Sequence, residues 1–287
     1  MRPSGRSEEA MRAIDVHVHP STRGVDAHAC AYFRRDAREV PQTAEAFSAL
    51  YSRHDVQALL IGWHPSTVRE GSRNSNEHVI ELSTKHPDCF PGVLASLDMA
   101  AHDLRAVARD AEALARHAKV VGFKFHPPDQ AFYPSDKKYY EIWEVLEAAG
   151  KPVMFHIGFT VLGAGTAGGS GIGLDYGRPV HLDTLARDFP RMTVVAAHPG
   201  WPWVDEAIAV LTHKRNVYVD TSGYLAEQLP RVFQKAIGGR LQDKALFGTD
   251  YPYVDLAEAL ASFDHMDFSD RVKDKLLVEN AKRVFRL

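Results

Sequence analysis

Eight short apolar runs recur along this chain, and segments with helical spacing of apolar residues fill the intervals between them. The runs are rich in β-branched residues and alternate little between polar and apolar positions, which is typical of parallel strands buried on both faces. Strands that alternate with helices predict a parallel sheet, and eight units predict that the sheet closes into a barrel. The expected strands span residues 12–19, 56–63, 90–97, 120–125, 152–157, 193–197, 217–219 and 245–249.

Two long connections interrupt this regular pattern. Residues 158–179, after the fifth run, are rich in glycine but match neither GxGxxG at the start of a helix nor GxxxxGK[ST], so we interpret them as a mobile loop over a site. An open, doubly wound sheet is the other α/β architecture, but it does not need eight units without a glycine-rich first turn. Residues 20–55, after the first run, form an insertion whose Arg34, Arg35 and Arg38 either cover the site or face solvent. Helices are expected from Thr43 onward and over 137–149, 180–189, 204–213, 225–237, 255–264 and 269–286.

Composition and charge exclude several classes of protein. The chain has 287 residues, of which 45% are hydrophobic, and a net charge of −3, so no basic surplus indicates a nucleic-acid partner. No apolar run approaches the length of about 18 residues that a membrane span requires, and the N-terminal segment has no apolar signal core. The two cysteines, Cys30 and Cys89, are expected to be free thiols. We therefore expect a cytoplasmic protein with a flexible segment at residues 1–11 and one domain at residues 12–287.

Polar side chains follow the strands at the points where they end. His17 and His19 are separated by one residue, so in an extended strand both imidazoles point to the same face. Because the carboxyl ends of all barrel strands converge on one rim, side chains from distant parts of the chain are expected to meet there and to hold a metal ion. The strand-end residues are His17, His19, His64, Asp98, Lys124, His126, His156, His198, Asp220 and Asp250.

Five motifs in order resemble the amidohydrolase superfamily, and within it the amidohydrolase-2 branch that includes aminocarboxymuconate-semialdehyde decarboxylase. They are IDVHVHP, GFKFHP, FHIG, AAHPGWPW and FGTDYPY. The resemblance implies a single, distorted (β/α)8 TIM barrel that holds one divalent metal ion, zinc most often and manganese as the alternative. It implies that His17, His19 and His156 are metal ligands and that Asp250 is both a ligand and a group that moves a proton. His198 is implied to lie near the reacting water or substrate, where an imidazole can exchange a proton.

Other strand-end residues leave alternatives open. Lys124 and His126 are expected to contact an anionic group of the substrate, although Lys124 could instead bridge two metals or pair with Asp98. Trp201 is expected to line the pocket of an aromatic substrate. Asp220 could orient a ligand histidine or cap the following helix.

The resemblance implies two reactions for the same apparatus. We expect first a metal-dependent hydrolase, in which a water activated by the metal attacks a small substrate that is aromatic-derived or carboxylate-bearing. The alternative is a non-oxidative decarboxylase of a small aromatic or muconate-type acid. A remote alternative of another class is an inactive barrel that holds a metal and serves in binding. A small-molecule partner and a homodimer are expected, with no nucleic acid and no membrane.

Overall fold

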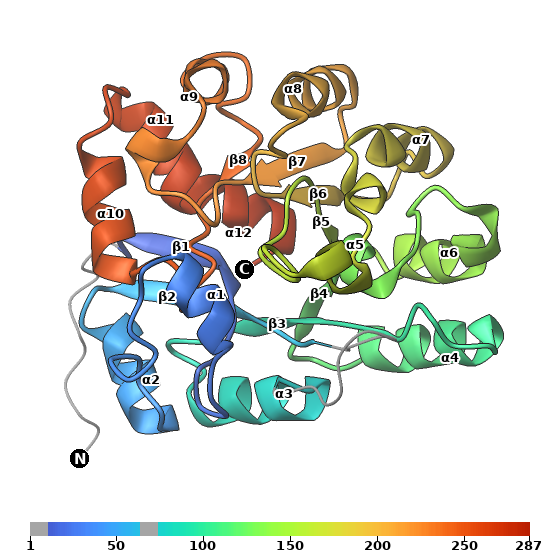
Figure 1. The fold of residues 1–287 in the computed structure, drawn as a ribbon, viewed down its shortest axis with the longest axis horizontal. Helices are drawn as coiled ribbons and strands as arrows, with labels where there is room; N and C mark the ends of the chain where they lie inside the picture. Colours follow the sequence, from blue (N-terminus) through green and yellow to red (C-terminus); the bar gives the residue numbers. More distant parts are fainter. Residues whose placement is uncertain (1–10, 64–73) are drawn as a thin grey trace.

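The computed structural model describes residues 11–63 and 74–287, and it places eight parallel strands in one sheet in chain order (Figure 1). Helices surround the sheet, as expected for a (β/α)8 barrel. The predicted fold class is therefore confirmed. The strands are β1 (Ala13–Val18), β2 (Val56–Ile61), β3 (Gly92–Ala95), β4 (Val120–Phe125), β5 (Val153–His156), β6 (Val194–Ala197), β7 (Val217–Asp220) and β8 (Ala245–Leu246). Predicted His64 lies outside the described residues, as does the predicted flexible N-terminus except for its last residue.

Twelve α-helices are found in the described part of the chain. They are α1 (Ala27–Tyr32), α2 (Ala44–Ser52), α3 (Asn76–Lys85), α4 (Leu104–Ala115), α5 (Pro127–Gln130), α6 (Tyr140–Ala148), α7 (Val180–Asp188), α8 (Val204–His213), α9 (Arg231–Ile237), α10 (Leu256–Asp264), α11 (Asp270–Asp274) and α12 (Asn280–Phe285).

One helix prediction was wrong in its continuity. The helix predicted over 225–237 is a short 3-10 turn, Ala226–Gln228, followed by α9, because Pro230 precedes α9 and cannot continue a helix from before it. The helix predicted over 269–286 is found without a break over 270–285, with a π-helical turn, Lys275–Glu279, between α11 and α12. The glycine-rich segment contains two 3-10 turns, Ala167–Gly171 and Leu174–Gly177, and no strand.

The barrel is closed by residues that follow β8 rather than by β8 itself, which has only two residues. The amide of Val16 donates to the carbonyl of Phe247 at 3.0 Å, and the amide of His19 donates to the carbonyl of Tyr251 at 2.8 Å. A side-chain contact reinforces this seam, because the buried Asp15 carboxylate accepts from the amide and the hydroxyl of Thr249 at 3.0 and 2.6 Å. The first and last strands thus fix each other's register.

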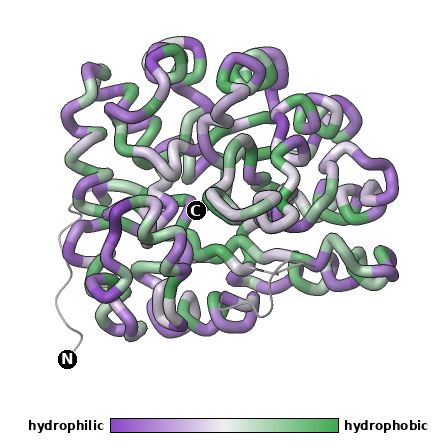
Figure 2. The backbone as a smooth tube through the Cα atoms, viewed as in Figure 1, coloured by the Kyte–Doolittle hydropathy of each residue, from purple (hydrophilic) through white to green (hydrophobic). Residues whose placement is uncertain are grey.

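Two apolar layers hold the strands in place. The larger lies between the strands and the outer helices, whose outward faces carry the hydrophilic residues in Figure 2. The smaller fills the barrel interior and includes Ile14, Val16 and Met154 from the strands together with Val284 and Phe285 from α12. Because α12 contributes to this interior cluster, it packs against one end of the barrel and leaves the strand ends at the other end for a site. No helix among the described residues is both long enough and apolar enough to cross a bilayer.

Candidate metal and substrate site

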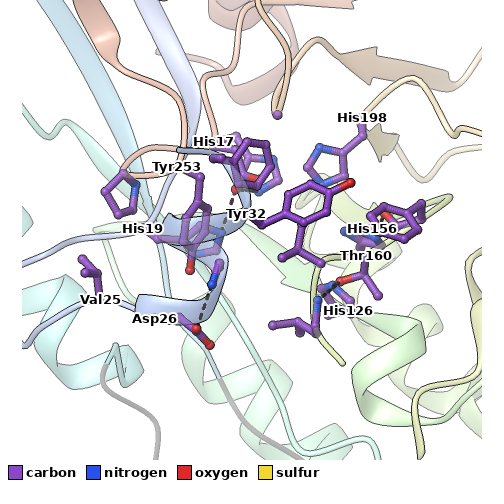
Figure 3. Close-up of a pocket in the computed structure, with 18 of the residues that line it drawn as sticks. His17, His19, Val25, Asp26, Tyr32, His126, His156, Thr160, His198 and Tyr253 are labelled. Carbon is purple, nitrogen blue, oxygen red and sulfur yellow. Dashed lines mark hydrogen bonds and ion pairs between the residues drawn. The ribbon is translucent and has the colours of Figure 1, made fainter. Parts of the chain in front are cut away.

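A cavity of about 640 Å³ lies at the carboxyl ends of the strands. Eight predicted site residues line it, and the close-up in Figure 3 labels the five histidines among them, His17, His19, His126, His156 and His198. The predicted residues that line the cavity are His17, His19, Lys124, His126, His156, His198, Trp201 and Asp250. Such convergence follows from the parallel register, which brings all carboxyl ends to one rim.

His17, His19 and Asp250 form one of two candidate metal groups among the described residues. Asp250 Oδ1 lies 3.3 Å from His17 Nε2 and 3.2 Å from His19 Nε2. Two imidazole nitrogens and one carboxylate oxygen within this distance form a donor set that suits zinc, manganese or a similar divalent ion. The residues present therefore fit the divalent metal that the sequence predicts.

Asp220 and Ser222 contact His17 at Nδ1, the ring nitrogen that does not face Asp250. The Asp220 Oδ2 atom lies 2.9 Å from His17 Nδ1, and the Ser222 hydroxyl lies 3.0 Å from the same nitrogen and donates to Asp220 Oδ1 at 2.5 Å. His17 Nδ1 therefore carries the proton, and its Nε2 presents a lone pair toward Asp250. Asp220 orients His17, a candidate ligand, and it does not cap a helix, because Leu225 stands at the cap of the next helical turn.

Electrostatics keep the parts of this group in the protonation states that a metal site needs. Burial, followed by the charge of Lys124, lowers the pKa of His17 to about 3, so its imidazole is neutral. Burial by itself would raise the pKa of Asp250, but its interactions with His17, His19 and His198 outweigh that effect and lower it. A neutral imidazole beside a carboxylate is ready to bind a cation without first losing a proton.

His198 points its free nitrogen away from the supporting residues. Its Nδ1 donates to the Ser222 carbonyl at 3.0 Å, so Nε2 carries the lone pair. Burial lowers the pKa of His198, which keeps this nitrogen available to accept a proton. The backbone here has φ of +73°, and Asp250 has φ of +65°. A non-glycine residue in this left-handed region is strained by about 1–3 kcal/mol, and such strain concentrates at functional positions.

A second group of candidate ligands, His17, His198 and Asp220, also brings its donor atoms within 4.8 Å of one another. In this group the Nδ1 atoms of both histidines are already hydrogen-bonded to Ser222. The group with His19 and Asp250 therefore has more lone pairs to offer a metal.

His156 and His126 form a stacked pair on the other side of the cavity. Their ring centroids lie 3.9 Å apart, and His156 Nε2 donates to the carbonyl of Phe159 at 3.1 Å. The lone pair of His156 is therefore on Nδ1. Neither group of donor atoms within 4.8 Å includes His156, so its role as a metal ligand stays a prediction.

Lys124 is buried on the cavity floor. Its Nζ lies 3.1 Å from His17 Nε2, and burial lowers its pKa to about 8. The ion pair with Asp98 that the sequence left open is not found among the ion pairs of the described residues, and the Asp98 carboxylate accepts from the amide of Ala100. Lys124 therefore faces the candidate metal group and not the outer layer.

The side walls of the cavity come from the two long connections and from the segment after β8. The sequence predicted that the glycine-rich segment lies over the site and named Arg34 in the insertion, and both contribute to the lining. It did not single out Tyr32 at the end of α1, Phe159 and Thr160 in the glycine-rich segment, or Tyr253 after β8. The two loops meet where His28 Nε2 donates to the carbonyl of Ala164 at 3.1 Å. The insertion was expected either to cover the site or to face solvent, and its α1 covers the site.

The predicted aromatic contact, Trp201, stands at the cavity mouth. Its side chain is 52% exposed, and its ring meets Phe159 edge to face at a centroid distance of 5.6 Å. Phe159 in turn lies 6.0 Å from Tyr32. These three rings give the mouth an apolar lining above the polar floor.

A family model of amidohydrolases, Amidohydro_2, matches residues 14–287. The chain therefore belongs to this amidohydrolase family, and it is an enzyme of the amidohydrolase-2 type. A search of curated proteins found no significant match.

Several solved structures share the fold over nearly their whole length. An uncharacterized TIM-barrel protein from Bordetella bronchiseptica is 24% identical with a TM-score of 0.79, and the alignment covers 96% of this chain and 98% of that one. A dihydroxybenzoic acid decarboxylase from Polaromonas sp. JS666, solved with manganese and 2-nitroresorcinol, is 18% identical with a TM-score of 0.68 and coverages of 96% and 97%. A 5-carboxyvanillate decarboxylase from Novosphingobium aromaticivorans, solved with manganese and 4-hydroxy-3-methoxy-5-nitrobenzoic acid, is 18% identical with a TM-score of 0.66 and coverages of 98% and 97%. At these identities the likeness shows the fold.

Proposed function

We propose that this enzyme removes the carboxylate of a small hydroxylated aromatic acid, without oxidation, at a divalent metal. The observation that carries the proposal is the combination in one cavity of an aromatic mouth with a floor of imidazoles, a carboxylate and a buried lysine. A planar ring fits between aromatic side chains, and an anionic group fits the Lys124 ammonium and a bound cation. The decarboxylases of the same fold, two of them solved with manganese and an aromatic ligand, support this reading over the hydrolysis that the sequence favoured.

The candidate ligands for the metal are His17, His19, Asp250 and, from the opposite side, His156. A bound divalent ion would supply a Lewis acid that holds an oxygen of the substrate and withdraws electrons from the ring. The sequence favours zinc, whereas manganese is the ion in the two decarboxylase structures. The Asp250 carboxylate and the two Nε2 atoms beside it leave the rest of the cavity to the substrate.

Decarboxylation needs a proton at the ring carbon that loses the carboxylate. The bond between that carbon and the carboxylate breaks, its electrons stay with the ring, and carbon dioxide leaves as a proton adds to the same carbon. Asp250 and His198 are the two groups to which we assign this proton transfer, and both line the cavity. Lys124 can orient the carboxylate before the bond breaks, because its ammonium lies on the same floor.

Hydrolysis is the second candidate, and the orientation of His198 favours it. Its Nε2 lone pair faces away from Ser222, so it can accept a proton from an attacking water. Lys124 would then stabilise the oxyanion that forms on a carbonyl substrate. The same residues thus serve either reaction, and the substrate decides between them. The homodimer predicted from the family resemblance stays a prediction.

The experiment is a substrate screen of protein loaded separately with zinc and with manganese. We expect carbon dioxide release from 2,6-dihydroxybenzoate, 5-carboxyvanillate or a related hydroxybenzoate, with one deuterium at the former carboxylate carbon when the reaction runs in D2O. Esters, lactones and β-keto acids form the parallel panel, and acid release is the readout. Turnover confined to that second panel would overturn decarboxylation in favour of hydrolysis.

A further inference from the structure

Thr160 lies at the start of the glycine-rich segment and lines the cavity beside the stacked histidines His126 and His156 (Figure 3). Its side chain is 5% exposed, so its hydroxyl must satisfy its hydrogen bonds within the protein or with a bound molecule. The hydrogen bonds around Thr160 show whether its hydroxyl proton is donated to the protein or is left for a bound molecule.

His126 fixes the direction of the first hydrogen bond. Its Nδ1 accepts from the backbone amide of Asp129 at 3.1 Å. A backbone amide can only donate, so Nδ1 carries no proton and the neutral ring has its proton on Nε2. His126 Nε2 lies 3.3 Å from Thr160 Oγ1, and it must therefore be the donor in that contact.

The second lone pair of Thr160 Oγ1 is also occupied. The backbone amide of Leu162 donates to it at 3.2 Å. A hydroxyl oxygen has two lone pairs and one proton, so with both lone pairs in use the proton is left to donate in the remaining direction. No acceptor for it is found among the described residues, and Thr160 borders the cavity.

We infer that Thr160 is a specificity-determining residue whose hydroxyl donates a hydrogen bond to an oxygen of the bound substrate. The inference rests on the proposed function for the substrate's chemistry. His19 and Thr160 lie on opposite sides of the cavity in Figure 3, so a ring whose carboxylate meets the His17, His19 and Asp250 group presents its far edge to Thr160. The substrate is then an aromatic acid with a hydroxyl or methoxyl oxygen on that edge. A ring that lacks this oxygen leaves a buried donor without a partner, and the site discriminates against it.

The test is calorimetric binding to manganese-loaded protein of 2-hydroxybenzoate and its 3-, 4-, 5- and 6-hydroxy derivatives. In the natural protein at least one derivative should bind more tightly than the parent. The variant Thr160→Val should bind that derivative about tenfold more weakly, because one hydrogen bond is lost, whereas its affinity for the parent should stay within about twofold. Thr160→Ser keeps the hydroxyl and should restore the preference. On a substrate of that pattern, KM should rise in Thr160→Val while kcat stays within about twofold.

Thr160→Ala removes the hydroxyl with a smaller side chain and replaces Thr160→Val if that protein does not fold. Equal weakening of the parent and all derivatives in the valine and alanine variants would assign Thr160 a structural role and overturn the inference. Unchanged preference in these variants would also overturn it while leaving the proposed function intact. Absence of binding by any of the five acids to the natural protein would overturn the proposed function as well.

Discussion

The floor and the wall of the cavity are built in different ways. The floor, which we define as His17, His19, Lys124, His156, His198 and Asp250, stands on strand ends, and the buried Asp220 and Ser222 fix His17 and His198 within it. The wall, which we define as residues 24–34, 159–162 and 252–253, comes from loops, and Tyr32 within it is 54% exposed. A floor with fixed geometry can hold reacting atoms, whereas a wall of loops can change between relatives without disturbing the barrel. We therefore assign the chemistry to the floor and the choice of substrate to the wall.

The largest effect is expected at the centre of the floor. Asp250→Asn removes the charge that His17 and His19 share, and the loss of metal-assisted stabilisation of several kcal/mol should lower kcat/KM by about 10³-fold or more. Metal content per chain, measured by elemental analysis, should fall with it. Asp267→Asn, at an exposed position, is the matched control. Full metal content and activity in Asp250→Asn would show that Asp250 neither binds the metal nor takes part in the reaction.

A smaller loss is expected when a proton-transferring group is removed but the metal stays. His198→Asn should lower kcat by about 10²-fold, the usual worth of a general acid or base, with metal content unchanged. The measurement pairs steady-state kinetics with elemental analysis, and the exposed His102→Asn serves as control. Loss of metal together with activity would instead make His198 a ligand.

Substitution of Asp220, which supports a floor residue, should have a smaller effect than substitution of the floor residues themselves. In Asp220→Asn the hydrogen bond that orients His17 is weakened, and metal affinity should fall by about 10–100-fold. Competition with a chelator of known affinity measures this change. Thermal unfolding of the metal-free protein separates it from a loss of fold, and equal affinity for the metal would show that Ser222 alone suffices to hold His17.

The smallest effect is expected in the wall. Arg34 lines the cavity at an exposed position and makes no ion pair within the described residues, so Arg34→Gln should raise KM for an anionic substrate by no more than about fivefold, as for other exposed charge contacts. The increase should shrink at high salt, because exposed charges are screened. Arg38→Gln, which loses only an exposed pair with Asp36, is the control. A large fall in kcat in Arg34→Gln would contradict the division between floor and wall.

The sequence predicts the floor because its signals are local. Each strand can be recognised from an apolar run in the sequence. Because the strands are parallel, their carboxyl ends meet at one rim, so the convergence of His17, His156, His198 and Asp250 can be predicted without knowing their contacts. The prediction of one helix over 225–237 was wrong for an equally local reason. Pro230 interrupts the helix, and the spacing of apolar residues does not reveal this.

The wall could not be predicted because its contacts join segments that carry no periodic pattern. His28 and Ala164 are 136 positions apart, and nothing in either segment indicates the other. Thr160 is ordinary in sequence, and its donor role follows only from the directions of two hydrogen bonds. Trp201 was found from its motif, whereas Tyr32 lies outside all five motifs, and Tyr253, which ends FGTDYPY, was given no role from it.

The seam between Asp15 and Thr249 joins positions 234 residues apart. During synthesis on the ribosome, the strand with His17 and His19 emerges early. The barrel cannot close until Thr249, 234 residues after Asp15, has also been synthesised. Such a long wait predicts slow completion of folding, since distant contacts form late. With the proposed ligand set, tight metal binding would have to follow the emergence of Asp250 from the exit tunnel.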